Sequence, residues 1–198
     1  MEIRYLSHSE IDKEKWDDCI DNSTNPLIYG NSYYLDVVSP DCHAFVIEDY
    51  KVVFPIPIKT KMGIPYVAHP LFTQQLGMFS KSNDALINEA LIEKLVRKFR
   101  RCHIRTNANY PIEGKIWTER INLILGISHY SEVEKAFNQN TKRNLKKFRD
   151  NNLEITADLS TEEFIEFKKS NSRALLKDEE WKKMGNLINS IMMNNSGF

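Results

Sequence analysis

The densest positive charge in the sequence lies between Phe137 and Arg149, F-N-Q-N-T-K-R-N-L-K-K-F-R, where five of the thirteen residues are Lys or Arg. Ammonium and guanidinium groups gathered in this way are suited to binding phosphate or another anion, and the guanidinium adds a planar fork of donors. Neighbouring side-chain amides supply further, neutral donors. The candidate binding residues of this stretch are Lys142, Arg143, Asn144 and Lys147.

A helix would sort these side chains by face. At about 100° per residue the cations fall on one broad side, and the other side carries Thr141, Leu145 and Phe148. The spacing therefore predicts a basic amphipathic helix. Three interpretations remain open for it: a solvated surface helix, an anion site, or a nucleic-acid contact. The formal neutrality of the chain and the lack of a second basic patch disfavour nucleic acid.

A second group of polar residues interrupts an apolar run. Gln74 and Gln75 follow His69-Pro70 and precede Gly77. Buried amides at such a position usually bond to backbone groups that would otherwise be unpaired, and they can also line a polar cleft. Tyr34, on a predicted short helix, completes the set of candidate substrate-binding residues.

Several common catalytic and cofactor motifs are not present in the sequence. The seven glycines are dispersed, and no phosphate-cradling glycine-rich loop is found. Cys42-His43 and Cys102-His103 are adjacent pairs, and adjacent strand residues point to opposite faces, so no metal site is predicted. No G-x-S-x-G elbow occurs and no histidine spacing marks a base. The catalytic residues are therefore not assigned from sequence.

Length and composition indicate a globular protein. The chain has 198 residues, equal numbers of basic and acidic residues, and 41% hydrophobic residues, which is enough for a substantial core. No signal-like segment and no run of about 18 apolar residues occurs, so membrane insertion is not expected. The odd, scattered cysteines indicate free thiols and a cytoplasmic location.

The pattern of hydrophobic residues predicts a mixed α/β fold. Strands are predicted for residues 2–6, 43–48, 51–61, 64–68, 102–106, 120–125 and 153–157. Helices are predicted for residues 11–20, 33–38, about 83–99, 131 to about 137, and 137–149, the third capped by Ser82 or Asn83 with Leu86 on its buried side. Two more helices follow a capping box at Ser160, and the last of them carries Trp181.

Pro55 and Pro57 lie two apart in the strand predicted for residues 51–61, so their missing N–H groups point to the same side. That side cannot form a regular ladder. We therefore predict an interrupted strand edge near Phe54 to Ile58. It is either a margin of the sheet or the wall of a cleft.

Two stretches carry a resemblance to a known family. The run V-V-F-P-I-P-I-K-T-K-M-G-I-P-Y-V-A-H-P-L-F-T-Q-Q-L-G-M-F-S, followed by Y-S-E-V-E-K-A-F-N-Q-N-T-K-R-N-L-K-K-F, resembles the FemAB-like peptidyltransferases and related GNAT-like acyltransferases of bacteria. The resemblance extends to about Asn152. It implies a GNAT-like (acyl-CoA N-acyltransferase) mixed sheet flanked by helices in residues 1–152. Residues 153–198 would then open a second, incomplete domain of the same kind.

The resemblance also implies an activity. Such a protein transfers an acyl or aminoacyl group to an amine acceptor such as a peptidoglycan precursor, with acyl-CoA or aminoacyl-tRNA as donor and no permanently bound cofactor. A nucleotide-linked peptide and tRNA are the implied partners. Because the central strands of a second domain are not found, the alternative is an inactive, truncated or degenerate member that acts as a binding module. Pairing of two copies through the C-terminal unit is a further expectation.

Overall fold

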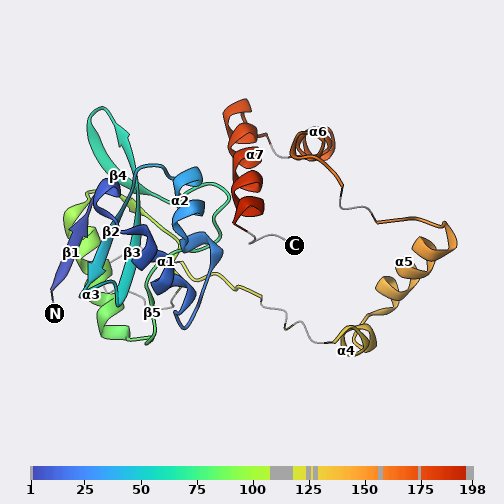
Figure 1. The fold of residues 1–198 in the computed structure, drawn as a ribbon, viewed down its shortest axis with the longest axis horizontal. Helices are drawn as coiled ribbons and strands as arrows, with labels where there is room; N and C mark the ends of the chain where they lie inside the picture. The colour runs from blue at the N-terminus through green and yellow to red at the C-terminus, as the bar shows by residue number, and fades with distance from the viewer. Residues whose placement is uncertain are drawn as a thin grey trace. The chain divides into compact units, whose positions relative to one another are not determined.

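The computed structural model describes residues 2–107, 118–123, 126, 129–155, 158–173 and 175–194. The chain forms two compact units, and each is described by itself (Figure 1). Unit 1 consists of Met1–Trp117 together with Thr161–Phe198, and unit 2 is Thr118–Ser160. The division into family domains at Asn152, which the resemblance implies, stays a prediction.

Unit 1 contains a mixed sheet. Its strands within the described residues are β1 (Ile3–Leu6), β2 (Cys42–Ile47), β3 (Val52–Lys61), β4 (Ile64–Ala68), β5 (Phe79–Ser80) and β6 (Cys102–His103). The order is β1-β2-β3-β4-β6, with β5 paired to β3. The β4–β6 pair is parallel and the other pairs are antiparallel. The predicted mixed α/β class, a sheet flanked by helices, is confirmed.

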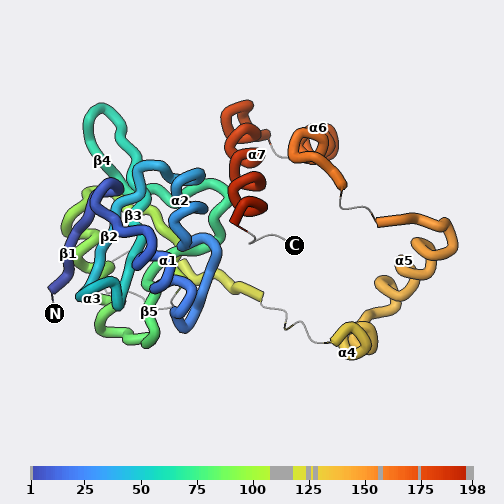
Figure 2. The backbone as a smooth tube through the Cα atoms, in the orientation of Figure 1, coloured from blue at the N-terminus to red at the C-terminus, as the bar shows by residue number. Residues whose placement is uncertain are grey.

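Helices cover both faces of this sheet (Figures 1 and 2). The helices of unit 1 are η1 (His8–Glu10), α1 (Lys13–Asp21), η2 (Ile28–Gly30), α2 (Ser32–Val38), α3 (Ala85–Lys98), α6 (Thr161–Asn171) and α7 (Asp178–Met193). One core contains Trp16 of α1 and Leu35 of α2, and the other contains Leu91 of α3. Because side chains alternate along a strand, Val53 enters the first core and Phe54 the second.

The prolines of β3 interrupt its ladder on one side. On one side of β3, strand β2 pairs with Val52 to Pro57. On the other side, β5 pairs only with Val52 and Val53, and the pairing with β4 starts at Ile58. The Ile58 N–H donates to the Asp41 carbonyl on the β2 side, so the nitrogens of Pro55 and Pro57 point the opposite way. The predicted interruption is confirmed. It lies inside the sheet, so the interpretation as a sheet margin is wrong.

Helix α3 differs from its sequence prediction in two details. Its N-cap is Asp84, whose carboxylate accepts from the N–H groups of Leu86 and Ile87, and the predicted caps Ser82 and Asn83 lie outside the helix. Leu86 is 76% exposed rather than buried. Asn88 and Leu91 define the buried face, and Leu86 lies two residues, or about 200°, from Asn88 on the opposite side.

Two predicted strands do not form in the described residues. Residues 118–123 and 153–155 have no strand structure, while positions 124, 125, 156 and 157 of these predictions lie outside the described residues. Ile121 and Ile155 are each 89% exposed. Alternating apolar residues form a strand only when another strand pairs with them, and none of the described strands does so.

The last two helices belong to unit 1. Helix α7 lies beside α2 (Figure 1), with Trp181 and Leu187 buried. The Lys183 ammonium donates to the Val38 carbonyl at 3.1 Å, and the Ser190 hydroxyl donates to the Tyr33 carbonyl at 3.3 Å. Helix α6 packs on α7, where the Thr161 hydroxyl donates to the amide oxygen of Asn189 at 2.6 Å. Helices α6 and α7 thus pack within unit 1.

Candidate functional site

The connection between β4 and β5 carries two of the predicted site residues. We call residues 69–75, which include Gln74 and Gln75, the 69–75 loop. Strands β4 and β5 pair with the same side of β3, at the two ends of the gap left by Pro55 and Pro57. The chain therefore leaves the sheet after Ala68 and returns at Phe79. The loop thus leaves the sheet next to Phe54 to Pro57 of β3, which have no paired strand on this side among the described residues.

Tyr34 fixes the middle of the loop. Its hydroxyl donates a hydrogen bond of 2.5 Å to the Phe72 carbonyl. Phe72 has a φ of 65°, in the left-handed region that a bulky residue rarely adopts. Burial raises the pKa of Tyr34, so the hydroxyl keeps its proton and remains a donor. The backbone conformation at Phe72 is thus supported by a buried tyrosine from α2.

Tyr29 connects Tyr34 to Gln74. The rings of Tyr29 and Tyr34 meet edge to face with centroids 5.4 Å apart, and the Tyr29 hydroxyl donates to Gln74 Oε1 at 3.3 Å. Gln74 is exposed and Gln75 is half-buried, so the interpretation of Gln74 as a buried amide is wrong. Gln74 instead presents its amide at the surface, bonded to the Tyr29 hydroxyl. Sequence reasoning missed Tyr29, which carries no local signal.

A different amide closes the backbone next to the loop. Asn107 Nδ2 donates to the Met78 carbonyl at 2.9 Å, and its backbone N–H donates to the Leu76 carbonyl at 2.5 Å. Gly77 has a φ of 127°, and a Cβ there would collide with the Asn107 side chain. Asn107 therefore bonds to backbone groups that would otherwise be unpaired, which is the role that the sequence suggested for Gln74 and Gln75. Two buried oxygens of this region, Thr73 Oγ1 and Asn107 Oδ1, have no hydrogen-bond partner in the described chain.

His69 holds the loop and is not a free base. Its Nδ1 accepts from the Arg105 N–H at 3.2 Å, which requires that Nε2 carries the proton given to the Thr73 carbonyl at 2.9 Å. Burial lowers the pKa of His69, and the nearby Arg105 acts in the same direction. Both ring nitrogens of this neutral imidazole are thus bonded to backbone groups. This supports a structural role for His69.

The other predicted residues lie in unit 2, on the helix pair α4 (Tyr130–Lys135) and α5 (Gln139–Asp150). Asn138 caps α5, because its side-chain oxygen accepts from the Thr141 N–H at 2.9 Å. The helix ends at Asp150, and Asn152, two residues later, is in the left-handed region, where the Leu153 N–H bonds back to the Phe148 carbonyl. Thr141 and Phe148 are half-buried, as is Leu145 between them. The predicted basic amphipathic helix is confirmed.

A groove lies between α4 and α5, and only some of the predicted cations line it. It is lined by Glu134, Lys135, Phe137, Lys142, Leu145, Lys146, Arg149 and Asp150. Lys142 is the single member of the predicted set in the groove. Arg143, Asn144 and Lys147 do not line it, and the Arg143 guanidinium donates to Asn140 Oδ1 at 2.8 Å. Lys146 and Arg149, which the sequence placed on the same side as Lys142, complete the basic wall.

The charge of this groove is unbalanced. Four cations and two carboxylates line it, over the apolar surface of Phe137 and Leu145. In the part of the chain that the structure describes, no residue of α5 takes part in an ion pair. Exposed cations without carboxylate partners beside an apolar surface suit a ligand that combines phosphate with an apolar or aromatic part.

Within the described residues, no group of three or more His, Cys, Asp or Glu side chains is arranged to hold a metal ion. No described helix combines the length and the apolar character needed to cross a bilayer. The cysteines are free thiols, with Cys19 and Cys42 buried and Cys102 half-buried.

The fold and the two polar regions define a mixed α/β protein with a tyrosine-supported loop in unit 1 and a basic groove in unit 2. No protein-family model, curated protein sequence or solved structure matches the chain.

Proposed function

We propose that this chain is a FemAB-like or GNAT-like transferase module that transfers an acyl or aminoacyl group to an amine acceptor such as a peptidoglycan precursor. The mixed sheet flanked by helices is compatible with the architecture that the resemblance implies. The observation that carries the proposal is the basic groove of unit 2, where Lys142, Lys146 and Arg149 have no carboxylate partner among the described residues. Each donor and acceptor implied by the resemblance, whether acyl-CoA, aminoacyl-tRNA or a nucleotide-linked peptide, bears phosphate.

Each region has a distinct part in the proposed reaction. The unit 2 groove binds phosphate, while Phe137 and Leu145 contact an apolar or aromatic part of the ligand. In unit 1, taken by itself, we assign acceptor binding to the exposed Gln74 amide and the supported 69–75 loop. Amide formation from an activated carbonyl needs mainly the amine and the carbonyl held in register, with a route for the proton. We assign these residues to binding and orientation.

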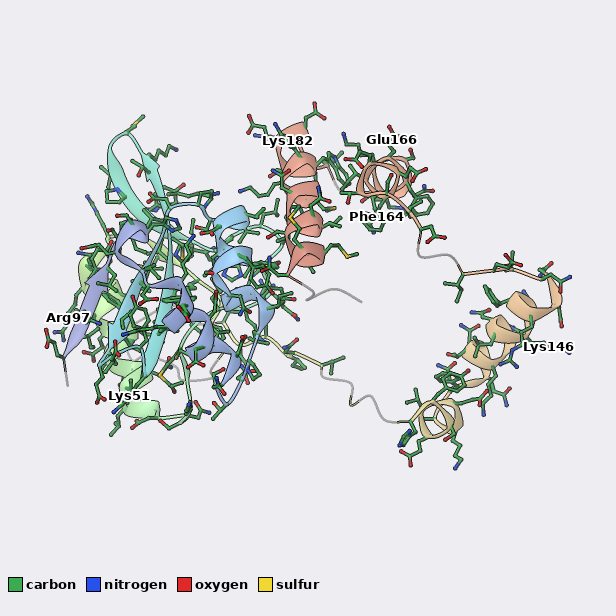
Figure 3. All side chains as sticks on the ribbon, viewed as in Figure 1. Lys51, Arg97, Lys146, Phe164, Glu166 and Lys182 are labelled. Carbon is green, nitrogen blue, oxygen red and sulfur yellow. The ribbon has the colours of Figure 1, made fainter. Side chains whose placement is uncertain are left out.

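A thermal-shift titration with a UDP-linked muramyl peptide, CoA, an acyl-CoA and tRNA tests the binding step. A ligand at one hundred times its dissociation constant should stabilise the protein by about 2.7 kcal/mol. The variant Lys142→Gln/Lys146→Gln removes two cations of the groove (Lys146 is labelled in Figure 3). The matched control Arg143→Gln/Lys147→Gln removes two cations of the same helix that do not line it.

We expect the groove variant to lose about tenfold in affinity and the control variant to lose less than threefold, since exposed charge contacts contribute about 0.2–1 kcal/mol each. Equal losses in both variants would assign binding to the whole basic helix instead. No shift with any of the four ligands would contradict the proposal.

A second candidate function is a binding module without catalysis. His69 favours it, because this imidazole of the 69–75 loop has both nitrogens bonded to backbone groups. The two functions differ in turnover: only the transferase consumes acyl-CoA or aminoacyl-tRNA in the presence of an amine acceptor. Binding of the muramyl nucleotide without consumption of either donor would favour the module. Pairing of two copies through the C-terminal unit also stays a proposal, which sedimentation analysis would test.

A further inference from the structure

A groove of unit 1 is separate from both regions described above. It lies between the β3–β4 hairpin, the C-terminal half of α3 and the segment that follows this helix, residues 100–104. We call it the α3 groove. Its volume is about 1250 Å³, which exceeds the roughly 300–1,000 Å³ of small-molecule pockets. The space therefore suits a segment of chain better than a compact metabolite.

The floor of the α3 groove is apolar. Val67 of β4 and Leu95 and Phe99 at the end of α3 belong to the second core and are buried. At the hairpin, Met62 and Ile64 also line the groove, with exposures of 92% and 61%. Apolar side chains of a bound segment would remove these two residues from water, which favours binding.

The charged residues of the α3 groove have one sign, so unit 1 carries a second basic patch, and the sequence prediction that there is none is wrong. Lys61, Arg100 and Arg101 line it together with His103, and among the described residues that line it there is no Asp or Glu. The three cations take part in no ion pair within the part of the chain that the structure describes. In a chain with equal numbers of acidic and basic residues, this separation favours a ligand with several negative charges.

The edge of β4 limits how such a ligand binds. The Val67 N–H donates to the Arg101 carbonyl at 3.0 Å, on the side of β4 away from β3. The backbone N–H groups of alternate β4 residues therefore point to this side. Pro65 is one of these residues and has no N–H, and β6 pairs only with Val67 and Ala68. A strand added here, from a second copy or another protein, would lack a donor at Pro65. Side chains rather than a continued ladder must provide recognition.

We propose that the α3 groove binds an extended acidic peptide in which carboxylate and apolar side chains alternate. The carboxylates meet Lys61, Arg100 and Arg101, and the apolar side chains lie on the floor and against Ile64. A fatty acid would match the floor but has one carboxylate for three cations. This inference goes beyond the proposed function and does not depend on it, because none of its residues belongs to the 69–75 loop or to unit 2.

The test is fluorescence polarisation with a mixed library of labelled peptides in which Glu or Asp alternates with an apolar residue. A second library with Lys in place of the acidic residues and decanoate as a competitor are the comparisons. The groove variant is Arg100→Gln/Arg101→Gln. Its matched control is Lys51→Gln/Arg97→Gln, at two exposed cations of unit 1 that do not line the groove (Figure 3).

We expect the acidic library to bind, the groove variant to bind it about three- to tenfold more weakly, and the control variant to stay within twofold. Ile64→Ser, at an exposed position, should also weaken binding and leave the folded spectrum in circular dichroism unchanged. Failure of the acidic library to bind the wild-type protein would overturn the proposal. Equal binding of the basic library, or displacement of the peptides by decanoate at its own binding concentration, would also overturn it.

Discussion

The Tyr34 hydroxyl bonds to the Phe72 carbonyl across 38 positions of sequence, and it does so at a residue held in the left-handed region. This contact joins α2 to the 69–75 loop, which itself exists because Pro55 and Pro57 prevent a continuous ladder on β3. Strained conformations of bulky residues persist only where the surroundings over-determine them. Tyr34 is therefore expected to control the shape of the loop.

Tyr34→Phe tests this role. The substitution keeps the ring and removes the donor, so we expect a loss of about 1–2 kcal/mol in the free energy of unfolding, measured by urea denaturation. Tyr29→Phe is the matched control, because its hydroxyl bonds at 3.3 Å to the exposed Gln74 and should contribute less than about 0.5 kcal/mol. Equal costs for the two variants would contradict a special role for Tyr34.

His69 predicts a pH dependence of stability. Burial lowers the pKa of His69 in the folded protein, while the unfolded chain keeps the ordinary value near 6.5. Below that pH the unfolded state binds more protons than the folded state, so stability falls as the pH decreases through about 6.5. Above it the contribution of His69 is fully present. One proton gives a slope of at most about 1.4 kcal/mol per pH unit.

The measurement is the free energy of unfolding between pH 5 and pH 8 for wild type and His69→Gln. A glutamine can accept from the Arg105 N–H and donate to the Thr73 carbonyl, as His69 does, without titrating. We expect the acidic decline to be shallower in His69→Gln. His69→Ala should be less stable at every pH, since both backbone groups lose their partner. Parallel curves for wild type and His69→Gln would show that His69 has no such effect.

Local chemistry made several elements predictable from sequence. The stripe of Thr141, Leu145 and Phe148 depends only on helical period, and the structure half-buries all three. The turn at Met62-Gly63 joins two strands by two residues with φ of 52° and 76°, a conformation that glycine favours. The proline pair of β3 is equally local, because a missing N–H acts wherever the strand is placed.

Features that depend on distant partners were not predictable. Residues 120–123 alternate as a strand does, but no described strand pairs with them. Gln74 is exposed because Asn107, more than thirty positions later, takes the backbone contacts. Lys142 lines the unit 2 groove and Arg143 does not, because α4 forms the groove along only one side of α5. In each case a tertiary contact decides between alternatives that the local pattern left equal.

Asp17 should be important for the start of α2. Its two carboxylate oxygens accept from the backbone N–H and from the hydroxyl of Ser32, each at 2.6 Å. They thus satisfy an N–H of the first turn of α2 from another helix. Asp17→Ala should lower the free energy of unfolding by about 1–3 kcal/mol in a urea titration. Asp17→Asn, which keeps an acceptor, should lose less, and an unchanged stability in Asp17→Ala would show that the bonds contribute nothing.

The packing of α7 can be tested with Trp181→Ala. Because Trp181 is only 6% exposed and α7 lies against α2, its truncation should cost about 3–5 kcal/mol. Met193→Ala on the same helix is the control, since that side chain is 83% exposed and should cost less than about 0.5 kcal/mol.

Hydrogen exchange then separates two ways of losing this stability. If α7 is part of the cooperative core of unit 1, Trp181→Ala should speed exchange in β2 and β3 as well as in α7. Faster exchange confined to α6 and α7 would mean that the two helices detach from α2 as a local unit. A cost below about 1 kcal/mol would contradict the packing of α7 itself, and with it the assignment of residues 161–194 to unit 1.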